Sequence, residues 1–225
     1  MRTDTLNFDT ANGATTAFVA EPTNANGDTP TVVIIQEWWG INDNIKNIAE
    51  RYAAENFRAI APDLYRGKLA TNPTEAGELM QALQIEDGVD TIKNAVAKAR
   101  ETFGTTRKFG ITGFCMGGTF SLRAACDLDE FGAACPFYGD IPPADVLKNL
   151  KTPVRFFAGM RDKWINPDKV NNELKTPALQ YNLPVEVFSY DADHAFFNNT
   201  RPEVFDKAAA EDAWRKVLEL FKEKL

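Results

Sequence analysis

Short apolar runs alternate with helical stripes along most of the chain. The run Thr31–Ile35 is continuous and rich in β-branched residues, which is typical of a strand covered on both faces. Similar short runs predict five more strands, at residues 57–61, 108–112, 132–138, 154–158 and 185–190. Apolar residues at a spacing of three and four predict helices between them, at 42–56, 89–103, 114–127, 144–150, 167–181 and 210–221.

The first twenty residues have a different pattern, in which apolar and polar residues alternate. Thr5 to Asp9 and Thr15 to Ala20 both alternate, and Asn12-Gly13 between them is a strong hairpin signal. Farther along, Asn72-Pro73-Thr74-Glu75 predicts the start of one more helix, with Asn as its cap and Pro at its first position.

Strands that alternate with helices form βαβ units and therefore a parallel sheet. The pattern predicts one α/β domain over residues 1–225. We expect a mostly parallel central sheet with helices on both faces, led by the N-terminal antiparallel hairpin.

Composition narrows the possible partners and the compartment. The 225 residues carry a formal charge of −7, which repels nucleic acids, and no apolar run is long enough to cross a membrane. Residues 1–9 lack the apolar core of an export signal. Three cysteines and no such signal indicate free thiols in a reducing cytoplasm. We expect a monomer, with a homodimer as the alternative.

The strongest local motif is Gly113-Phe114-Cys115-Met116-Gly117-Gly118, between a predicted strand and a predicted helix. It is the cysteine version of the G-x-S-x-G nucleophile elbow. Its glycines allow the sharp turn, and the start of the helix favours a thiolate. The motif predicts that Cys115 is a nucleophile; the alternative is an inert buried cysteine in a glycine-rich turn.

The order of residues after this motif matches that of α/β-hydrolases, namely nucleophile, acid and histidine. Asp162 follows the strand at 154–158, and His194, the single histidine, follows the strand at 185–190. An acid in this position would hold the imidazole in one tautomer. Asp168, Asp191 and Asp193 compete for the acid role, but the position of Asp162 directly after a strand favours it.

A third motif, Gln36-Glu37-Trp38-Trp39-Gly40, stands at the end of the first buried strand. An acid and two tryptophans at the carboxyl end of a strand would face the region of the elbow. The alternative is a carboxylate at a helix start beside two packing aromatics.

Several motifs together resemble the dienelactone hydrolase family, whose members are also called carboxymethylenebutenolidases. The resemblance runs from about Thr15 to Phe221 and includes the three motifs above. It also includes Asp63-Leu64-Tyr65, Gly159-Met160-Arg161-Asp162 and His194-Ala195-Phe196-Phe197-Asn198.

The resemblance implies a role for each of these positions. Cys115 would be the nucleophile, His194 the acid–base and Asp162 its orienting partner. Glu37 would hold and then deprotonate the resting thiol, and the N–H groups of Trp38 and Met116 would form the oxyanion hole. The implied reaction is cleavage of a lactone or ester through a thioester, with no metal and no organic cofactor.

The chain departs from the family pattern where members bind a substrate carboxylate through arginines. The arginine expected four residues after the histidine is replaced by Asn198, and no Lys or Arg occurs between Lys68 and Lys93. Arg66, Arg161 and Arg201 are possible substitutes. Trp39, Tyr138, Phe196 and Phe197 would line an aromatic pocket.

Three other functions stay open at this point. The first is a hydrolase of uncharged esters or thioesters with wider specificity. The second is a different enzyme with a cysteine elbow, such as a glutamine amidotransferase, although that class would need a His-x-Glu pair and His194 is followed by Ala195 and Phe196. The third is a binding protein that kept the fold and lost the activity.

Overall fold

The computed structural model describes all residues from Met1 to Leu225, and the chain forms two compact units, Met1–Gly110 and Ile111–Leu225. The elements of the first unit are β1 (Arg2–Thr10), β2 (Gly13–Glu21), β3 (Thr31–Ile35), α1 (Asp43–Ala54), β4 (Arg58–Pro62), α2 (Pro73–Ala82) and α3 (Ile85–Phe103). Strand β5 (Phe109–Phe114) begins at the boundary. The second unit continues with α4 (Met116–Asp127), β6 (Phe131–Phe137), α5 (Ala144–Leu147), β7 (Val154–Gly159), α6 (Pro167–Lys169), η1 (Val170–Lys175), α7 (Thr176–Gln180), β8 (Val185–Tyr190) and α8 (Lys207–Lys224).

The strand order confirms the predicted arrangement of hairpin and parallel strands. The order is β1-β2-β4-β3 in the first unit and β5-β6-β7-β8 in the second. β1 pairs antiparallel with β2, and β2 with β4, whereas the pairs β3–β4, β6–β7 and β7–β8 are parallel. Parallel strands place all their carboxyl ends at one edge, and the loops at that edge of the second unit carry Asp162 and His194.

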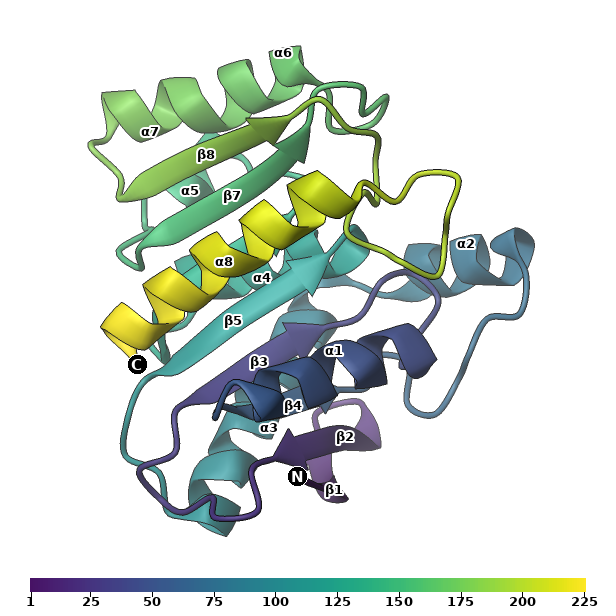
Figure 1. The fold of residues 1–225 in the computed structure, drawn as a ribbon, viewed down its shortest axis with the longest axis vertical. Coiled ribbons are helices and arrows are strands. Elements are labelled where there is room, and N and C mark those ends of the chain that lie inside the picture. Colours follow the sequence, from purple (N-terminus) through teal and green to yellow (C-terminus); the bar gives the residue numbers. More distant parts are fainter. The chain divides into compact units, whose positions relative to one another are not determined.

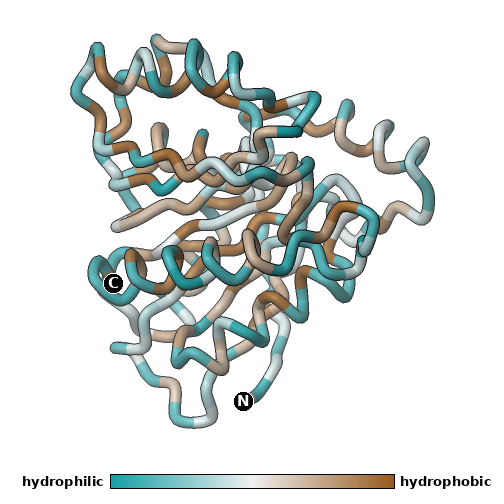
Figure 2. Tube along the Cα trace, turned by 45° about the horizontal axis from the view of Figure 1, so that its top comes forward, coloured by the Kyte–Doolittle hydropathy of each residue, from teal (hydrophilic) through white to brown (hydrophobic).

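Helices cover both faces of the strands, as the apolar stripes predict. In the first unit α1 packs on β2 and β4 while α3 packs on β1 and β4, and Figure 1 shows these two helices in front of and behind the strands. In the second unit α4 packs on β6, and α8 packs on β6 and β7. Figure 2 shows apolar and polar positions alternating along the helices, and the longer helices α1, α3 and α8 bury apolar residues that recur at helical spacing.

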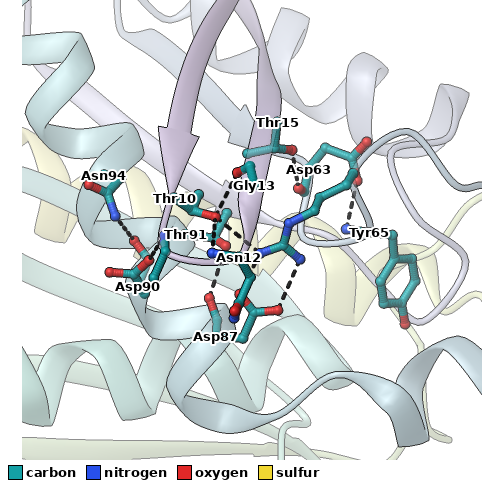
Figure 3. A network of polar contacts seen from close by, with 12 residues as sticks. Thr10, Asn12, Gly13, Thr15, Asp63, Tyr65, Asp87, Asp90, Thr91 and Asn94 are labelled. Carbon is teal, nitrogen blue, oxygen red and sulfur yellow. Dashed lines mark hydrogen bonds and ion pairs between the residues drawn. The ribbon is translucent and has the colours of Figure 1, made fainter.

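The hairpin turn is tied to α3 by carboxylates. The N–H of Ala11 donates to Asp90 Oδ2 over 3.0 Å, and Arg66, which follows β4, reaches both Asp87 and the hydroxyl of Thr10. Figure 3 shows Asp87 and Asp90 beside Thr10, Asn12 and Gly13. The predicted cap of α2 is also present, since Asn72 Oδ1 accepts from the N–H of Glu75 over 3.0 Å.

The single helix predicted over 167–181 is wrong, because the segment divides into α6, the π-helical η1 and α7. Pro177 has no N–H to give to the carbonyl of Glu173, and its ring would collide with that carbonyl in a regular helix. The wider π turn avoids this collision, and the Thr176 hydroxyl donates to the Asn171 carbonyl over 2.9 Å. None of the helices is both long and apolar enough to cross a bilayer.

Candidate active site

Cys115 lies at the sharp turn between β5 and α4, as the elbow motif predicts. Its backbone has φ 56° and ψ −118°, a strained conformation for a residue with a side chain. The N–H of Cys115 donates to the carbonyl of Phe137 at the end of β6 over 3.1 Å, which holds the turn in place. Cys115 is half-buried, whereas Cys126 and Cys135 are buried.

The turn depends on close contact between two glycines. A Cβ on Gly118 would lie 2.4 Å from the carbonyl oxygen of Phe137 and 2.9 Å from the Cα of Gly139. A Cβ on Gly139 would lie 2.2 Å from the backbone of Gly118 and Thr119. Only glycines therefore let α4 start this close to β6. The sequence motif contains Gly118, but its partner Gly139 is brought to it only by the fold.

Asp162 follows β7 and is held from both sides. Its Oδ1 accepts from the N–H groups of Trp164 and Ile165 over 2.8 and 2.9 Å, and its Oδ2 is 2.6 Å from Nδ1 of His194. Burial raises the pKa of this carboxyl, but the hydrogen bond and charge of His194 and the two N–H donors outweigh burial and bring the pKa below its ordinary value. Asp162 is therefore a charged partner for the imidazole at neutral pH.

The loop that carries His194 is fixed against the loop that carries Asp162. A Cβ on Gly159 would lie 2.5 Å from the carbonyl oxygen of Ala192, so the two loops touch through their backbones. The Arg161 guanidinium bridges them by binding the carboxylates of Asp191 and Asp193. This clamp keeps the imidazole within reach of Asp162.

His194 hydrogen-bonds to Asp162 through Nδ1, and Cys115 is close enough to the imidazole to affect its pKa. Burial lowers the pKa of His194, but the hydrogen bonds and charges of Asp162 and Cys115 outweigh burial and raise it from 6.5 to about 9. Because Asp162 holds Nδ1, the other ring nitrogen, Nε2, is the one left for the sulfur. The structure thus joins Asp162 to His194, and the catalytic roles of the three residues stay predictions.

Two of the three competing carboxylates are engaged elsewhere. Asp191 and Asp193 bind Arg161, and Asp168 is an exposed residue of α6. The imidazole is hydrogen-bonded to Asp162. The imidazole thus pairs with Asp162, the carboxylate that the sequence favours because it directly follows a strand.

Aromatic residues surround the imidazole. The ring of Tyr138, a residue 1% exposed with φ 38°, has its centroid 5.0 Å from that of His194. Phe196 and Phe197 are buried and pack against Phe137, so they form part of the core under the site. A further aromatic, Trp164, lies 5.0 Å from His194 on the exposed side. Trp164 is not among the residues that the motifs predict for the site, although its place two residues after Asp162 is a signal for it.

The arginines that could bind a substrate carboxylate are all paired with carboxylates of the chain. Arg66 binds Asp87, Arg161 binds Asp191 and Asp193, and Arg201 binds Glu203. Asn198 is buried, and its Oδ1 accepts from both the N–H and the hydroxyl of Thr200. The roles of Asn198, Arg201, Tyr138 and Phe196 in substrate binding stay predictions.

Glu37, Trp38 and Trp39 belong to the first unit, whereas the cysteine, aspartate and histidine belong to the second. Glu37 is 3% exposed and directly follows the end of β3 and Gln36. Gln36 Oε1 accepts from the N–H of Leu64 over 3.2 Å, which joins this turn to the Asp63-Leu64-Tyr65 motif after β4. Trp38 and Trp39 pack edge to face with centroids 5.1 Å apart. Their roles toward Cys115, and that of Met116 at the start of α4, stay predictions.

Comparison with known proteins shows the family. The model of the dienelactone hydrolase family matches residues 15–225, and this chain belongs to that family. It is 39% identical to the protein usf of Aquifex pyrophilus, over 87% of this chain and 89% of the relative. It is 38% identical to a protein of Aquifex aeolicus provisionally named carboxymethylenebutenolidase, over 86% and 87% of the two chains.

A solved structure extends the comparison to the fold. The crystal structure of a provisionally named dienelactone hydrolase from Klebsiella pneumoniae superposes with a TM-score of 0.89 at 26% identity, covering 99% of this chain and all of the other. The predicted α/β-hydrolase fold is confirmed, and the chain is a hydrolase of this family.

Proposed function

We propose that the chain hydrolyses lactones or esters through a thioester formed on Cys115, with His194 as acid–base and Asp162 as its orienting partner. The observation that carries this proposal is the hydrogen bond of 2.6 Å between Asp162 and His194, and the influence of Cys115 on the pKa of the same imidazole supports it. A nucleophile, a base and a residue that orients the base are the parts that covalent acyl transfer requires.

In the first half of the reaction the Cys115 sulfur attacks the carbonyl carbon and forms an S–C bond. The C–O bond to the leaving oxygen then breaks, and the proton on Nε2 of His194 passes to that oxygen. A histidine with a pKa of about 9 carries this proton at neutral pH. In a lactone the leaving oxygen stays attached as the hydroxyl of the opened ring.

In the second half, water hydrolyses the thioester, and His194 takes a proton from that water. Two of the causes that raise the pKa of His194 are the hydrogen bond and the charge of Cys115. Both are lost once the sulfur is acylated, so the pKa of His194 falls and the neutral imidazole becomes available as a base. The same residue can therefore serve as acid and then as base.

The oxyanion formed during the attack requires N–H donors. Met116 is the first residue of α4, a helix of 12 residues, so its N–H belongs to the positive end of that helix. We assign Met116 and, from the family resemblance, Trp38 as the two donors, each contributing on the order of 10²–10³ in rate. Glu37 is assigned the role of holding the resting thiol.

A second candidate substrate class is the uncharged ester or thioester. The pairing of the three arginines favours this class. Arg66, Arg161 and Arg201 each bind a carboxylate of the chain already, so none is left to bind a carboxylate of the substrate. A substrate carboxylate left without a partner beside the aromatic neighbours of His194 would be costly to bury. Enol lactones without a carboxylate and uncharged aryl esters are therefore expected to be the better substrates.

The test is a hydrolysis screen of dienelactones that carry a carboxylate against uncharged lactones and aryl esters. We expect wild type to form an acyl adduct on Cys115 that intact-mass measurement detects after rapid acid quench. We expect Cys115→Ala to lose both the adduct and turnover. Wild-type turnover in Cys115→Ala would overturn the proposal, whereas a preference for carboxylate-bearing lactones would overturn only the second substrate class.

A further inference from the structure

Trp164 is a large apolar side chain that stands in solvent beside the catalytic histidine of the proposed mechanism. Its side chain lies in the loop after β7, and the residue is 70% exposed. The centroid of its ring is 5.0 Å from that of His194, and the two planes meet at 70°. An exposed tryptophan at this place provides a large aromatic surface that the fold leaves uncovered.

The position of Trp164 is fixed by the same carboxylate that orients His194. The N–H of Trp164 donates to Asp162 Oδ1 over 2.8 Å, while Oδ2 of the same group binds His194. The next residue, Ile165, is buried and donates to the same oxygen. The backbone of Trp164 is therefore held at a set place relative to the imidazole, and its indole extends from this fixed point beside the ring.

The imidazole has two aromatic neighbours, and only one of them is open to solvent. Tyr138 and Trp164 both have ring centroids 5.0 Å from that of His194. Tyr138 is 1% exposed and belongs to the core, so it offers little surface to a ligand. Trp164 is the neighbour that a bound molecule can contact.

The direction of proton transfer indicates which part of the substrate lies beside the indole of Trp164. Asp162 occupies Nδ1 of His194, so the proton goes from Nε2 to the leaving oxygen as the C–O bond breaks and the bond to Cys115 forms. The alcohol portion of an ester must then lie next to the imidazole. The exposed indole is the apolar surface adjacent to that ring.

We infer that Trp164 forms the wall of a leaving-group subsite that favours esters with an aromatic alcohol portion. This inference rests on the proposed function and adds the substrate class that the site selects. An aromatic ring packed on the indole is expected to raise the rate of acylation by about tenfold over an aliphatic group.

The test compares two esters of the same uncharged acid, a phenyl ester and a hexafluoroisopropyl ester, whose leaving alcohols are similarly acidic. The measured quantity is the ratio of their kcat/KM values, which report acylation. In Trp164→Ala we expect the ratio of aryl to alkyl ester to fall about tenfold. Trp164→Phe keeps an aromatic ring and should keep the ratio within about threefold of wild type.

A ratio that stays at the wild-type value in Trp164→Ala would overturn the inference, and so would an equal loss of activity on both esters, which indicates a purely structural role. The control is Leu179→Ala. Leu179 lies in α7 and is 84% exposed, so truncating its side chain should change neither the ratio nor the kcat/KM for either ester. Activity of Cys115→Ala on the same esters would instead contradict the proposed function, so the two failures are distinguishable.

Discussion

The carboxylate of Asp162 and the imidazole of His194 are joined by a hydrogen bond of 2.6 Å, although 32 positions separate them in the sequence. The parallel pairing of β7 and β8 creates this contact, because it brings the loops after the two strands to the same edge. The backbone approach at Gly159 and the Arg161 clamp then hold the loops together. The geometry of the candidate site is thus a direct product of strand register.

The hydrogen bond between Asp162 and His194 predicts that activity depends on the charge of Asp162 more than on that of Asp193. Asp162→Asn keeps the shape of the side chain but removes the charge that fixes the tautomer of His194. We expect kcat to fall on the order of 10³–10⁴-fold, as the corresponding change does in serine triads. The matched control is Asp193→Asn, which removes one ion pair with Arg161 and should change kcat less than about tenfold. Equal losses in the two variants would contradict the assignment.

The three cysteines should differ sharply in reactivity. Burial raises the pKa of Cys126 to about 12 and also raises that of Cys135, so both remain thiols at neutral pH. Cys115 is half-buried and close enough to His194 to affect the pKa of the imidazole. We expect iodoacetamide to modify one cysteine per folded chain at pH 7.5 and all three in urea. Peptide mapping that finds the fast adduct on Cys126 or Cys135 would count against a reactive Cys115.

The raised pKa of His194 predicts how stability depends on pH. The folded chain binds this proton more tightly than the unfolded chain, so the stabilisation is full below pH 6.5 and is lost as the pH rises through about 9. Between pH 6 and 9.5 the free energy of unfolding of wild type should fall by roughly 2–3 kcal/mol more than that of His194→Gln. Asp162, whose pKa is lowered, stays charged in both states over this interval and does not add to the change.

Urea unfolding of both proteins at the two pH values measures this difference. The buried cysteines also become less favourable at high pH, but they are present in both proteins and their effect cancels. Parallel pH profiles for wild type and His194→Gln would show that the pKa of His194 is not raised by folding.

The close contact between Gly118 and Gly139 at the elbow predicts that a side chain at position 118 destabilises the fold, and Gly77 in α2 provides a control. In Gly118→Ala the new Cβ would meet backbone atoms of Phe137 and Gly139, which cannot move without displacing β6. We expect a loss of about 2–4 kcal/mol in the free energy of unfolding. Gly77→Ala in α2 places its Cβ in open space and should add about 0.5–1 kcal/mol. Chemical denaturation of the two variants beside wild type checks both signs, and a neutral Gly118→Ala would refute the close-contact argument.

Local patterns determined much of the fold. The Asn72 cap and the buried run Thr31–Ile35 appear in the structure where the sequence predicts them, and the hairpin turn lies one residue earlier than predicted, at Ala11-Asn12, with Gly13 as the first residue of β2. Each depends on residues a few positions apart, whose conformational preferences and hydrogen bonds act within one turn or one strand. The elbow at Cys115 belongs to the same group, because glycine spacing and the strand-to-helix change are both local.

Contacts between distant segments were decided only by the tertiary structure. The sequence places Asp162, Asp191 and Asp193 in loops after strands, but the pairing of β7 with β8 determines which carboxylate meets the imidazole and which ones meet Arg161. The approach of Gly139 to Gly118 and of Trp164 to His194 depends likewise on packing between elements. Local spacing cannot encode these contacts, because the register of the strands and the close packing of the loops fix the distances between them.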